Sequence, residues 1–349
     1  MPTSVTRRAA LLGLAAGAVA TQAQAAPPGE PVTGGLVEAA KKEGVVVFHS
    51  SIELSVCQAM IDGFNKRYPD VKVQLERTGA ERILQRITQE YASNIHAADF
   101  VESSDMGTFV DWKKKGWLAA YVPEDVAESW PAEERDPDGR FASIRASLSV
   151  LSCNTRQVKP EDRPASFADL LHPRWRMRMV KAHPSYSGSI LTSTYATAKA
   201  LGWEYFEKLA KQRVMQTQSA VDPPKKVAQG ERSVGVDGSE YVVLNLQDAG
   251  EPIIPIYATE GTPIFSGQGA VMEAAPHPNA ARLFASYVFS TEGQQLMADS
   301  GNLRSFDPKV REKPGHASLK DIKLLWTDPN ALAAAAEEVK RKYTEIFGV

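Results

Sequence analysis

The sequence predicts an α/β fold with two lobes, each built on a mixed, mostly parallel sheet with helices on both faces. Three observations support this prediction. From residue 36 onward, helical and strand-like patterns alternate with short connections, as in successive β-α units. A second series of the same kind runs from about residue 149 to 255. The chain has 349 residues, which suffices for two domains with separate cores at roughly 100 to 200 residues per domain.

The first series of elements is defined by apolar spacing and by residues that end helices. A helix over 36–44 ends at Gly44, and the apolar run 45–48 has the pattern of a buried parallel strand. The next helix, over 55–69, stops at Pro69 because proline disfavours helical geometry in the residue before it. The remaining elements are a strand over 71–76, a helix over 80–91, a strand over 98–103 and a helix over 106–117.

The second series continues without a low-complexity linker, so we expect strands to cross between the lobes and to form the hinge. Pro276 and Pro278 then interrupt the pattern, and a helix begins afresh after them. The predicted strands cover 147–154, 177–182, 233–238, 252–257 and a segment near 270. The predicted helices cover 189–201, 203–213, 223–230 and 239–248, with two more between 279 and 301.

Residues 1–25 have the layout of an export signal. Arg7 and Arg8 precede an apolar stretch from 9 to 20, and Ala23-Gln24-Ala25 has the small-residue pattern of a cleavage site. The apolar stretch is shorter than the roughly 20 residues that a membrane-spanning helix needs. We expect export followed by cleavage after Ala25, and the arginine pair favours the twin-arginine route.

Charge and motifs argue against several classes of protein. Removal of residues 1–25, whose only charges are two arginines, leaves 324 residues with 38 basic and 42 acidic side chains, a net charge of −4. This mild acidity does not support nucleic-acid binding. The sequence lacks Gly-x-Ser-x-Gly, His-Glu-x-x-His, Cys-x-x-Cys and phosphate-loop motifs, and its six histidines are scattered, so we expect neither an enzyme nor a cofactor. Cys57 and Cys153 lie among apolar residues and are expected to be free, buried thiols.

The stretch "MVKAHPSYSGSIL" (179–191) reads as strand, tight loop and helix. The first turn of a helix has backbone N–H groups without intrahelical partners and carries the positive end of the helix dipole. Ser187, Gly188 and Ser189 at such a position therefore favour an anion site. The alternative is that the two serines only cap the helix.

Five segments resemble the family 1 extracellular solute-binding proteins of bacterial ABC importers, in the branch that includes ferric-ion-, phosphonate- and sugar-phosphate-binding proteins. The likeness runs in order from about 36 to 310. The segments are 45–51, 98–118, 135–160, 166–179 and 274–302.

The resemblance implies a type II periplasmic binding protein whose two lobes close on a ligand and deliver it to an ABC permease in the inner membrane. It implies a periplasmic monomer that binds a small molecule and no nucleic acid. A sensor subunit that presents its bound ligand to a membrane receptor is an alternative role. The expected lobes are 26–148 with 262–320, and 149–261 with 321–349.

The resemblance also allows a comparison with the ferric branch, position by position. It implies that those proteins hold iron with a histidine after the first strand, a glutamate after the third and two adjacent tyrosines in the second lobe, ligands that suit a hard cation. Here Ile52, Ser104 and Tyr241-Val242 stand at those positions, so three of the four ligands are missing. We expect no metal ligands, but ferric binding stays an alternative because His49 and Glu102 lie nearby in the sequence.

The expected ligand is therefore a small organic anion, namely a phosphonate, a phosphate ester or a carboxylate. Open α/β sheets bind ligands at the carboxyl ends of their strands, which places the turns after several strands in one cleft. Arg145, Arg77 and Lys181 are candidates for the balancing cation, and Arg145 has the alternative of pairing with an acid at the lobe junction. The candidate ligand-binding residues are Ser50, Ser51, Ser104, Arg145, Ser187, Gly188, Ser189, Asp237 and Tyr241.

The export signal gives a first testable prediction. The mature protein is expected to begin at Ala26 and to carry no lipid, because no cysteine lies near the predicted cleavage site. Mass spectrometry of the exported protein measures its N-terminus directly. An intact N-terminus or a lipid-modified one would contradict the prediction.

Overall fold

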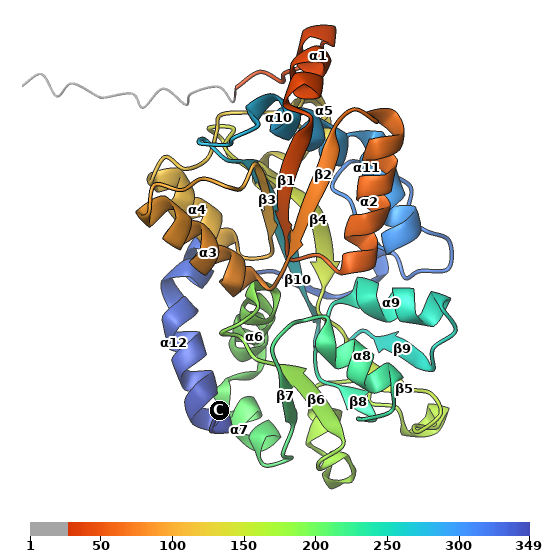
Figure 1. Cartoon of the computed structure of the whole chain (residues 1–349). Coiled ribbons are helices and arrows are strands. Elements are labelled where there is room, and N and C mark those ends of the chain that lie inside the picture. The colour runs from red at the N-terminus through yellow and green to blue at the C-terminus, as the bar shows by residue number, and fades with distance from the viewer. Residues whose placement is uncertain (1–26) are drawn as a thin grey trace, which may run out of the picture.

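The structure is a computed structural model that describes residues 27–349 and contains two β-sheets, one in each of two lobes (Figure 1). The predicted two-lobed α/β fold is confirmed. The predicted export signal and its cleavage site lie outside the described residues. Within 27–349, no helix is long and apolar enough to cross a membrane. Both cysteines are free and buried, as expected.

The sheet of the first lobe has the order β11-β10-β3-β1-β2, and β4 pairs with β10. β1 runs parallel to β2 and to β3, whereas β10 runs antiparallel to β3 and β4. The carboxyl ends of β1, β2 and β3 therefore meet at one edge of the sheet. The strands are β1 (Val45–Ser50), β2 (Lys72–Arg77), β3 (Phe100–Ser103), β4 (Ala142–Leu148), β10 (Thr262–Val271) and β11 (Leu324–Leu325).

Helices cover both faces of this sheet because strands buried on two sides need an apolar partner on each. On one face, Phe284 packs its ring against those of Phe48, Phe64 and Phe100, with ring centroids 5.1 to 5.6 Å apart. On the other face, α3 and α4 form a separate apolar cluster with β3. The helices are α1 (Gly34–Glu43), α2 (Leu54–Arg67), α3 (Ala80–Ala92), α4 (Met106–Lys114), α5 (Glu124–Ser129), α10 (Pro278–Phe289) and α11 (Thr291–Gly301).

The sheet of the second lobe has the order β7-β6-β8-β5-β9. β6 runs parallel to β7 and β8, and β5 runs antiparallel to β8 and β9. Its strands are β5 (Leu151–Asn154), β6 (Met179–Ala182), β7 (Met215–Thr217), β8 (Val234–Gly235) and β9 (Ile253–Ile256). Its helices are α6 (Gly188–Leu201), α7 (Trp203–Ala210), α8 (Asp222–Ala228) and α9 (Glu240–Asp248).

The chain crosses between the sheets from β4 to β5 and again from β9 to β10. The single strand predicted over 147–154 is therefore two strands in different sheets. Ser149, between them, donates its backbone N–H to the carbonyl of Pro263, so the first crossing stays beside β10. The strand predicted near 270 begins earlier, at Thr262, because β10 pairs with β4 along most of its length.

The last helix, α12 (Pro329–Phe347), runs alongside both lobes (Figure 1). It packs against α4 of the first lobe and against α6 and α7 of the second. Tyr343 is its fully buried anchor in the core of the second lobe. This helix thus links the two lobes in addition to the two strand crossings.

Candidate ligand-binding site

A pocket between the lobes brings together most of the predicted site residues. Its walls come from Arg145 and from the segments that follow six strands, β1, β2, β3, β6, β7 and β8. The empty space there is about 300 Å³, part of it open to solvent. This is the edge at which open α/β sheets bind ligands. The lining residues are Ser51, Gly79, Ala80, Ser104, Arg145, Tyr186, Ser187, Ser189, Ser219, Ala220, Val221, Ser239 and Tyr241. We call this space the interlobe pocket.

Arg145 of β4 is the cation of the interlobe pocket. Its side chain is 3% exposed, and its guanidinium carbon lies 5.8 Å from the ring centroid of Tyr241 and 5.9 Å from that of Phe265. Nη2 donates to Glu102 Oε1 at 3.0 Å, whereas Nε and Nη1 are buried and have no hydrogen-bond partner in the described part of the chain. Two charged donors of this pocket-lining residue are therefore unpaired.

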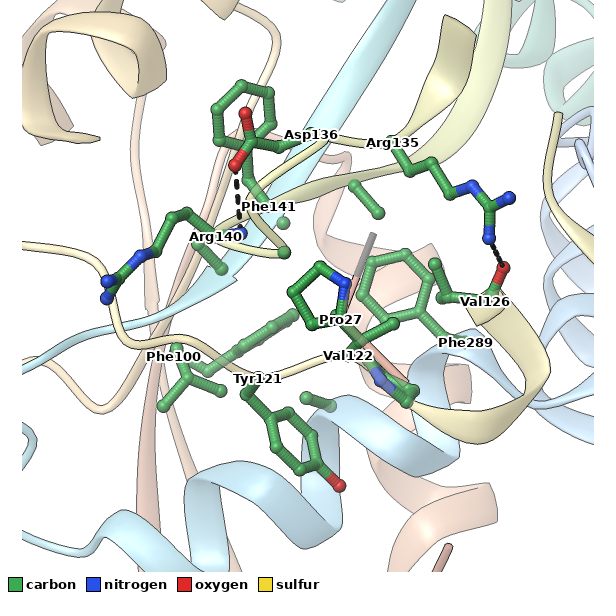
Figure 2. A pocket seen from close by; sticks show the side chains of 17 residues that line it. Pro27, Phe100, Tyr121, Val122, Val126, Arg135, Asp136, Arg140, Phe141 and Phe289 are labelled. Atoms are coloured by element: carbon green, nitrogen blue, oxygen red, sulfur yellow. Dashed lines mark hydrogen bonds between the residues drawn. The ribbon is translucent and has the colours of Figure 1, made fainter. Parts of the chain in front are cut away.

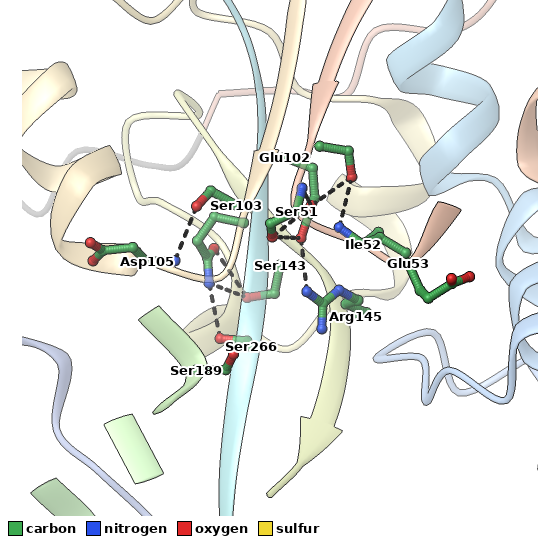
Figure 3. A network of polar contacts seen from close by, with 12 residues as sticks. Ser51, Ile52, Glu53, Glu102, Ser103, Asp105, Ser143, Arg145, Ser189 and Ser266 are labelled. Carbon is green, nitrogen blue, oxygen red and sulfur yellow. Dashed lines mark hydrogen bonds and ion pairs between the residues drawn. The ribbon is translucent and has the colours of Figure 1, made fainter. Parts of the chain in front are cut away.

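Glu102 of β3 organises the polar contacts behind the pocket (Figure 3). It is fully buried and accepts hydrogen bonds from Ser50 Oγ at 2.8 Å and from Ser51 N at 2.9 Å, in addition to the bond from Arg145. A Cβ atom at Gly267 would lie 2.8 Å from Glu102 Oε1 and 2.9 Å from Arg145 Nε. The ion pair therefore requires glycine at this point of β10.

Ser187 does not cap α6, although it stands at the N-cap position. Its backbone has extended geometry there, but its side chain makes no capping hydrogen bond. Its hydroxyl lies 3.1 Å from the hydroxyl of Ser189, and both residues line the pocket. The first turn of α6 is thus left without a side-chain cap at the pocket, and so are the first turns of α3 and α9.

Several contacts join the two lobes beside the pocket. A Cβ atom at Gly188 would lie 2.7 Å from the carbonyl oxygen of Ser104, so only glycine fits where α6 meets the other lobe. Glu53, at the start of α2, forms an ion pair with Lys225 of α8 at 3.0 Å. The backbone N–H of Glu53 also donates to the hydroxyl of Tyr241 at 3.1 Å.

Tyr241 faces the pocket as a neutral phenol. Burial raises the pKa of Tyr241 to about 12, although the nearby positive charge of Arg145 opposes this shift. Because its oxygen accepts the hydrogen bond from Glu53, its own proton is free to be donated to a ligand.

Three of the nine predicted residues do not line the pocket. Ser50 lies within β1 rather than in the turn after it, and its hydroxyl bonds to Glu102. Gly188 forms the contact between the lobes. Asp237 is buried beneath α6, where it accepts from Lys181 Nζ at 2.7 Å and from Ala182 N at 3.0 Å.

The other two candidate cations are occupied elsewhere. Lys181 is buried, pairs with Asp237 and donates to Thr194 on α6 at 3.2 Å. Arg77 donates to the backbone carbonyls of Ser51 and Ile52 and so shapes the turn after β1. Among the three candidates, Arg145 alone lines the pocket.

The nine predicted site residues omit three that precede α3, α8 and α9, although the turn 237–241 was expected to face the cleft. Gly79, Ser219 and Ser239 each stand just before a helix, as Ser187 does, and each lines the pocket. The sequence signal that pointed to Ser187, a small residue between a strand and a helix, also marks these three residues. Tyr186, half-exposed at the rim, carries no such signal.

The residues that matter for ferric binding do not form a metal cluster. Ile52 is fully buried in the apolar core. His49 is fully buried, neither ring nitrogen has a hydrogen-bond partner, and burial lowers its pKa. Residues 27–349 contain no group of three or more His, Cys, Asp or Glu side chains placed to hold a metal ion.

A separate hollow in the first lobe is not comparable to the interlobe pocket. Figure 2 shows it around Pro27, with the rings of Phe100, Tyr121 and Phe289 in its wall. Arg135, which also borders it, donates to the backbone carbonyls of Val126 and Ala127. The hollow is mainly apolar, and this arginine is already engaged with the chain itself.

Comparison with known proteins places this architecture in a family. Residues 55–302 match the family described as bacterial extracellular solute-binding protein, and the chain belongs to it. It is the periplasmic solute-binding component of an ABC transporter, of the type that includes ferric-ion- and sugar-phosphate-binding proteins. Such proteins bind a small-molecule ligand and deliver it to the permease; they are not enzymes.

Individual relatives agree in fold and differ in ligand. The periplasmic binding protein AfuA from Actinobacillus pleuropneumoniae, with fructose-6-phosphate bound, has a TM-score of 0.79 at 22% identity and covers 88% of this chain and 99% of its own. Iron-bound HitA from Pseudomonas aeruginosa has a TM-score of 0.72 at 22% identity and covers 86% and 99%. Iron uptake protein A2 of Synechocystis is 22% identical over 81% of this chain and 84% of its own length.

The buried pair of Lys181 and Asp237 generates a prediction about stability. Asp237→Ala leaves the lysine charge buried and uncompensated, so the free energy of unfolding is expected to fall by about 3 to 5 kcal/mol. Urea denaturation measures this change. Glu337→Ala, which breaks an exposed ion pair with Lys340, is the control and should leave stability nearly unchanged. Equal losses in the two variants would show that Asp237 has no special role.

Proposed function

We propose that this chain binds a small organic anion in the interlobe pocket, as a monomer, and delivers it to its permease. A phosphonate or phosphate ester is the preferred ligand, and a carboxylate is the second choice. The observation that carries the proposal is Arg145, which is almost fully buried and has two guanidinium nitrogens without partners at the pocket. Burying charged donors without an acceptor is costly, and an anionic ligand supplies the acceptor.

The remaining donors around the pocket suit a phosphoryl group. A guanidinium can bond two oxygens of one phosphate or phosphonate side by side. Ser187, Ser189 and Ser104 add hydroxyl groups, and the uncapped first turns of α3, α6 and α9 add backbone N–H groups with the positive ends of their dipoles. The terminal oxygens of a phosphoryl group outnumber the two of a carboxylate and can use more of these donors.

The charge of Glu102 determines how strongly an anion is attracted. Glu102 compensates the charge of Arg145 in the empty pocket, so the pair is close to neutral. Attraction then depends on the free donors and on the helix starts rather than on excess positive charge. Fructose-6-phosphate bound to AfuA, a protein of the same fold, supports a phosphate ester as the ligand.

We place the hinge at the two strand crossings, around 148–151 and 256–262. The first lobe then comprises 27–148 with 262–325, rather than ending at the predicted residue 320, because β11 pairs with β10, and the second comprises 149–261 with the end of the chain. The contacts of Glu53 with Lys225 and Tyr241 would form as the lobes close and separate as they open. Hinge closure of this kind buries a ligand between two rigid units.

Ser187→Ala tests the anion pocket. The variant is expected to bind fructose 6-phosphate or an alkylphosphonate, whichever stabilises the wild type, about tenfold to a hundredfold more weakly, because one hydrogen bond to a charged group is worth roughly 1.5 to 3 kcal/mol. The melting temperature of the empty protein should stay nearly unchanged, because Ser187 caps nothing. Calorimetry and thermal denaturation measure the two quantities.

Ser193→Ala is the matched control on the same helix. Ser193 is buried and lies 3.1 Å from the hydroxyl of Ser149, away from the pocket lining. It should lower the melting temperature and leave affinity unchanged. If Ser187→Ala instead lowers the melting temperature without changing affinity, the serine is a structural residue and the proposal fails.

Ferric iron is the second candidate, because iron is named for HitA and for Iron uptake protein A2. Ile52, Ser104 and Val242 replace three of the four ligands that the ferric branch uses, so we expect no iron binding. Protein mixed with ferric citrate and dialysed should remain colourless, since no tyrosinate-to-iron charge transfer can develop. A persistent red colour that is lost in Tyr241→Phe would establish iron as the cargo.

A further inference from the structure

A second pocket lies next to the interlobe pocket, and the two share Ser104 in their walls. It holds about 780 Å³ of empty space, part of it open to solvent. The start of α4 and β10 contribute to it from the first lobe, Thr192 of α6 from the second, and the start of α12 closes one side. We call it the aromatic pocket because Phe265, Phe306 and Trp326 line it.

The walls of the aromatic pocket are mainly apolar, and one of its aromatic side chains is exposed. Trp326 is 67% exposed, which is unusual for a side chain of this size and leaves its indole available at the rim. In the part of the chain that the structure describes, no lysine or arginine lies over the ring of Trp326 or Phe306. No lysine or arginine of the described residues therefore competes for these two rings, whereas Arg145 already lies over the ring of Phe265.

The only charged residues that line the aromatic pocket are two carboxylates, Glu133 and Glu134. Neither takes part in an ion pair within residues 27–349, although 22 ion pairs occur elsewhere in that range. Glu134 is partly buried and accepts a hydrogen bond from Ser143 Oγ at 2.6 Å. Burial raises its pKa, which is the expected response of a carboxylate without a cationic partner.

We propose that the aromatic pocket binds an organic cation, an ammonium group carried on a small apolar body. The ammonium would face Glu134 and the ring of Trp326, and the apolar body would rest against Phe265 and Phe306. Carboxylates and aromatic faces together favour a cation over a neutral group of the same shape. Because both lobes line this pocket, the bound cation would also hold them together.

The geometry permits two sources for the cation. Ser143, the partner of Glu134, precedes Arg145 by two residues on β4, so their Cα atoms are about 7 Å apart at 3.4 Å per residue. The ammonium can therefore belong to a separate molecule or to the far end of the anion that Arg145 holds. The cation pocket itself does not depend on the anion proposed above.

Calorimetry on the mature protein tests the inference with three probes. Choline is the cation, 3,3-dimethylbutan-1-ol is its neutral isostere, and phosphocholine joins the cation to a phosphate. We expect choline to bind at least tenfold more tightly than the neutral alcohol. If phosphocholine binds far more tightly than choline, one zwitterionic ligand spans both pockets; if choline and inorganic phosphate bind independently, there are two ligands. Either result supports the cation pocket.

Variants separate this site from the anion site. The double substitution Glu133→Gln with Glu134→Gln should weaken choline binding about tenfold and leave inorganic phosphate binding unchanged. Trp326→Ala, at an exposed position where folding is not at risk, should weaken choline binding without affecting phosphate. Glu161→Gln, at an exposed carboxylate of the other lobe, should change neither.

The inference is overturned if choline does not bind at millimolar concentration, if the neutral alcohol binds equally well, or if the double variant binds choline as the wild type does. Loss of phosphate binding in Ser187→Ala bears only on the anion site.

Discussion

The ion pair between Arg145 and Glu102 is the interaction on which the candidate site depends. It joins β4 to β3 across β10, and it forms only because Gly267 lets the guanidinium lie against that strand. Glu102 compensates one buried charge and also holds the turn after β1 through Ser50 and Ser51. Removing either partner would leave a charge buried in an apolar sheet, which is strongly destabilising. The same pair that stabilises the sheet therefore includes a residue that lines the interlobe pocket and has two buried nitrogens without partners.

The helices differ in whether a side chain caps their first turn. α1, α11 and α12 begin away from the interlobe pocket, and Thr33, Ser290 and Asp328 cap them with their side chains. α3, α6 and α9 begin at the pocket and have no side-chain cap. A cap typically contributes about 1 kcal/mol, so its absence at three helices that meet at one point leaves N–H groups for a ligand. α4, α5, α7, α8 and α10 also lack a side-chain cap, and Glu53 caps α2 next to Tyr241. The missing caps therefore have meaning only together with the unpartnered nitrogens of Arg145.

Apolar spacing was enough to predict the alternation of strands and helices, because a buried parallel strand and an amphipathic helix each leave a local pattern. It failed at 147–154, where two strands of different sheets follow each other with no break in composition. Asp237 shows a similar limit among the site residues. Its "DGS" context suggests a turn or a ligand contact, yet Lys181, 56 residues away in the chain, takes its charge. Partners so distant in sequence leave no local signal.

The sequence by itself determined the α/β class, the small residues at the strand-to-helix turns and the presence of Ser187, Gly188 and Ser189 before a helix, because each of these depends on neighbours within a few residues. Only the tertiary structure decided that six such turns meet at one pocket, that Arg145 rather than Arg77 or Lys181 faces it, and that Ser187 leaves its helix uncapped. It also placed Glu134 and Trp326, 192 residues apart in number, in one wall. These outcomes depend on how strands from distant parts of the chain pair and on which charges the fold brings together, and local patterns do not encode such distances.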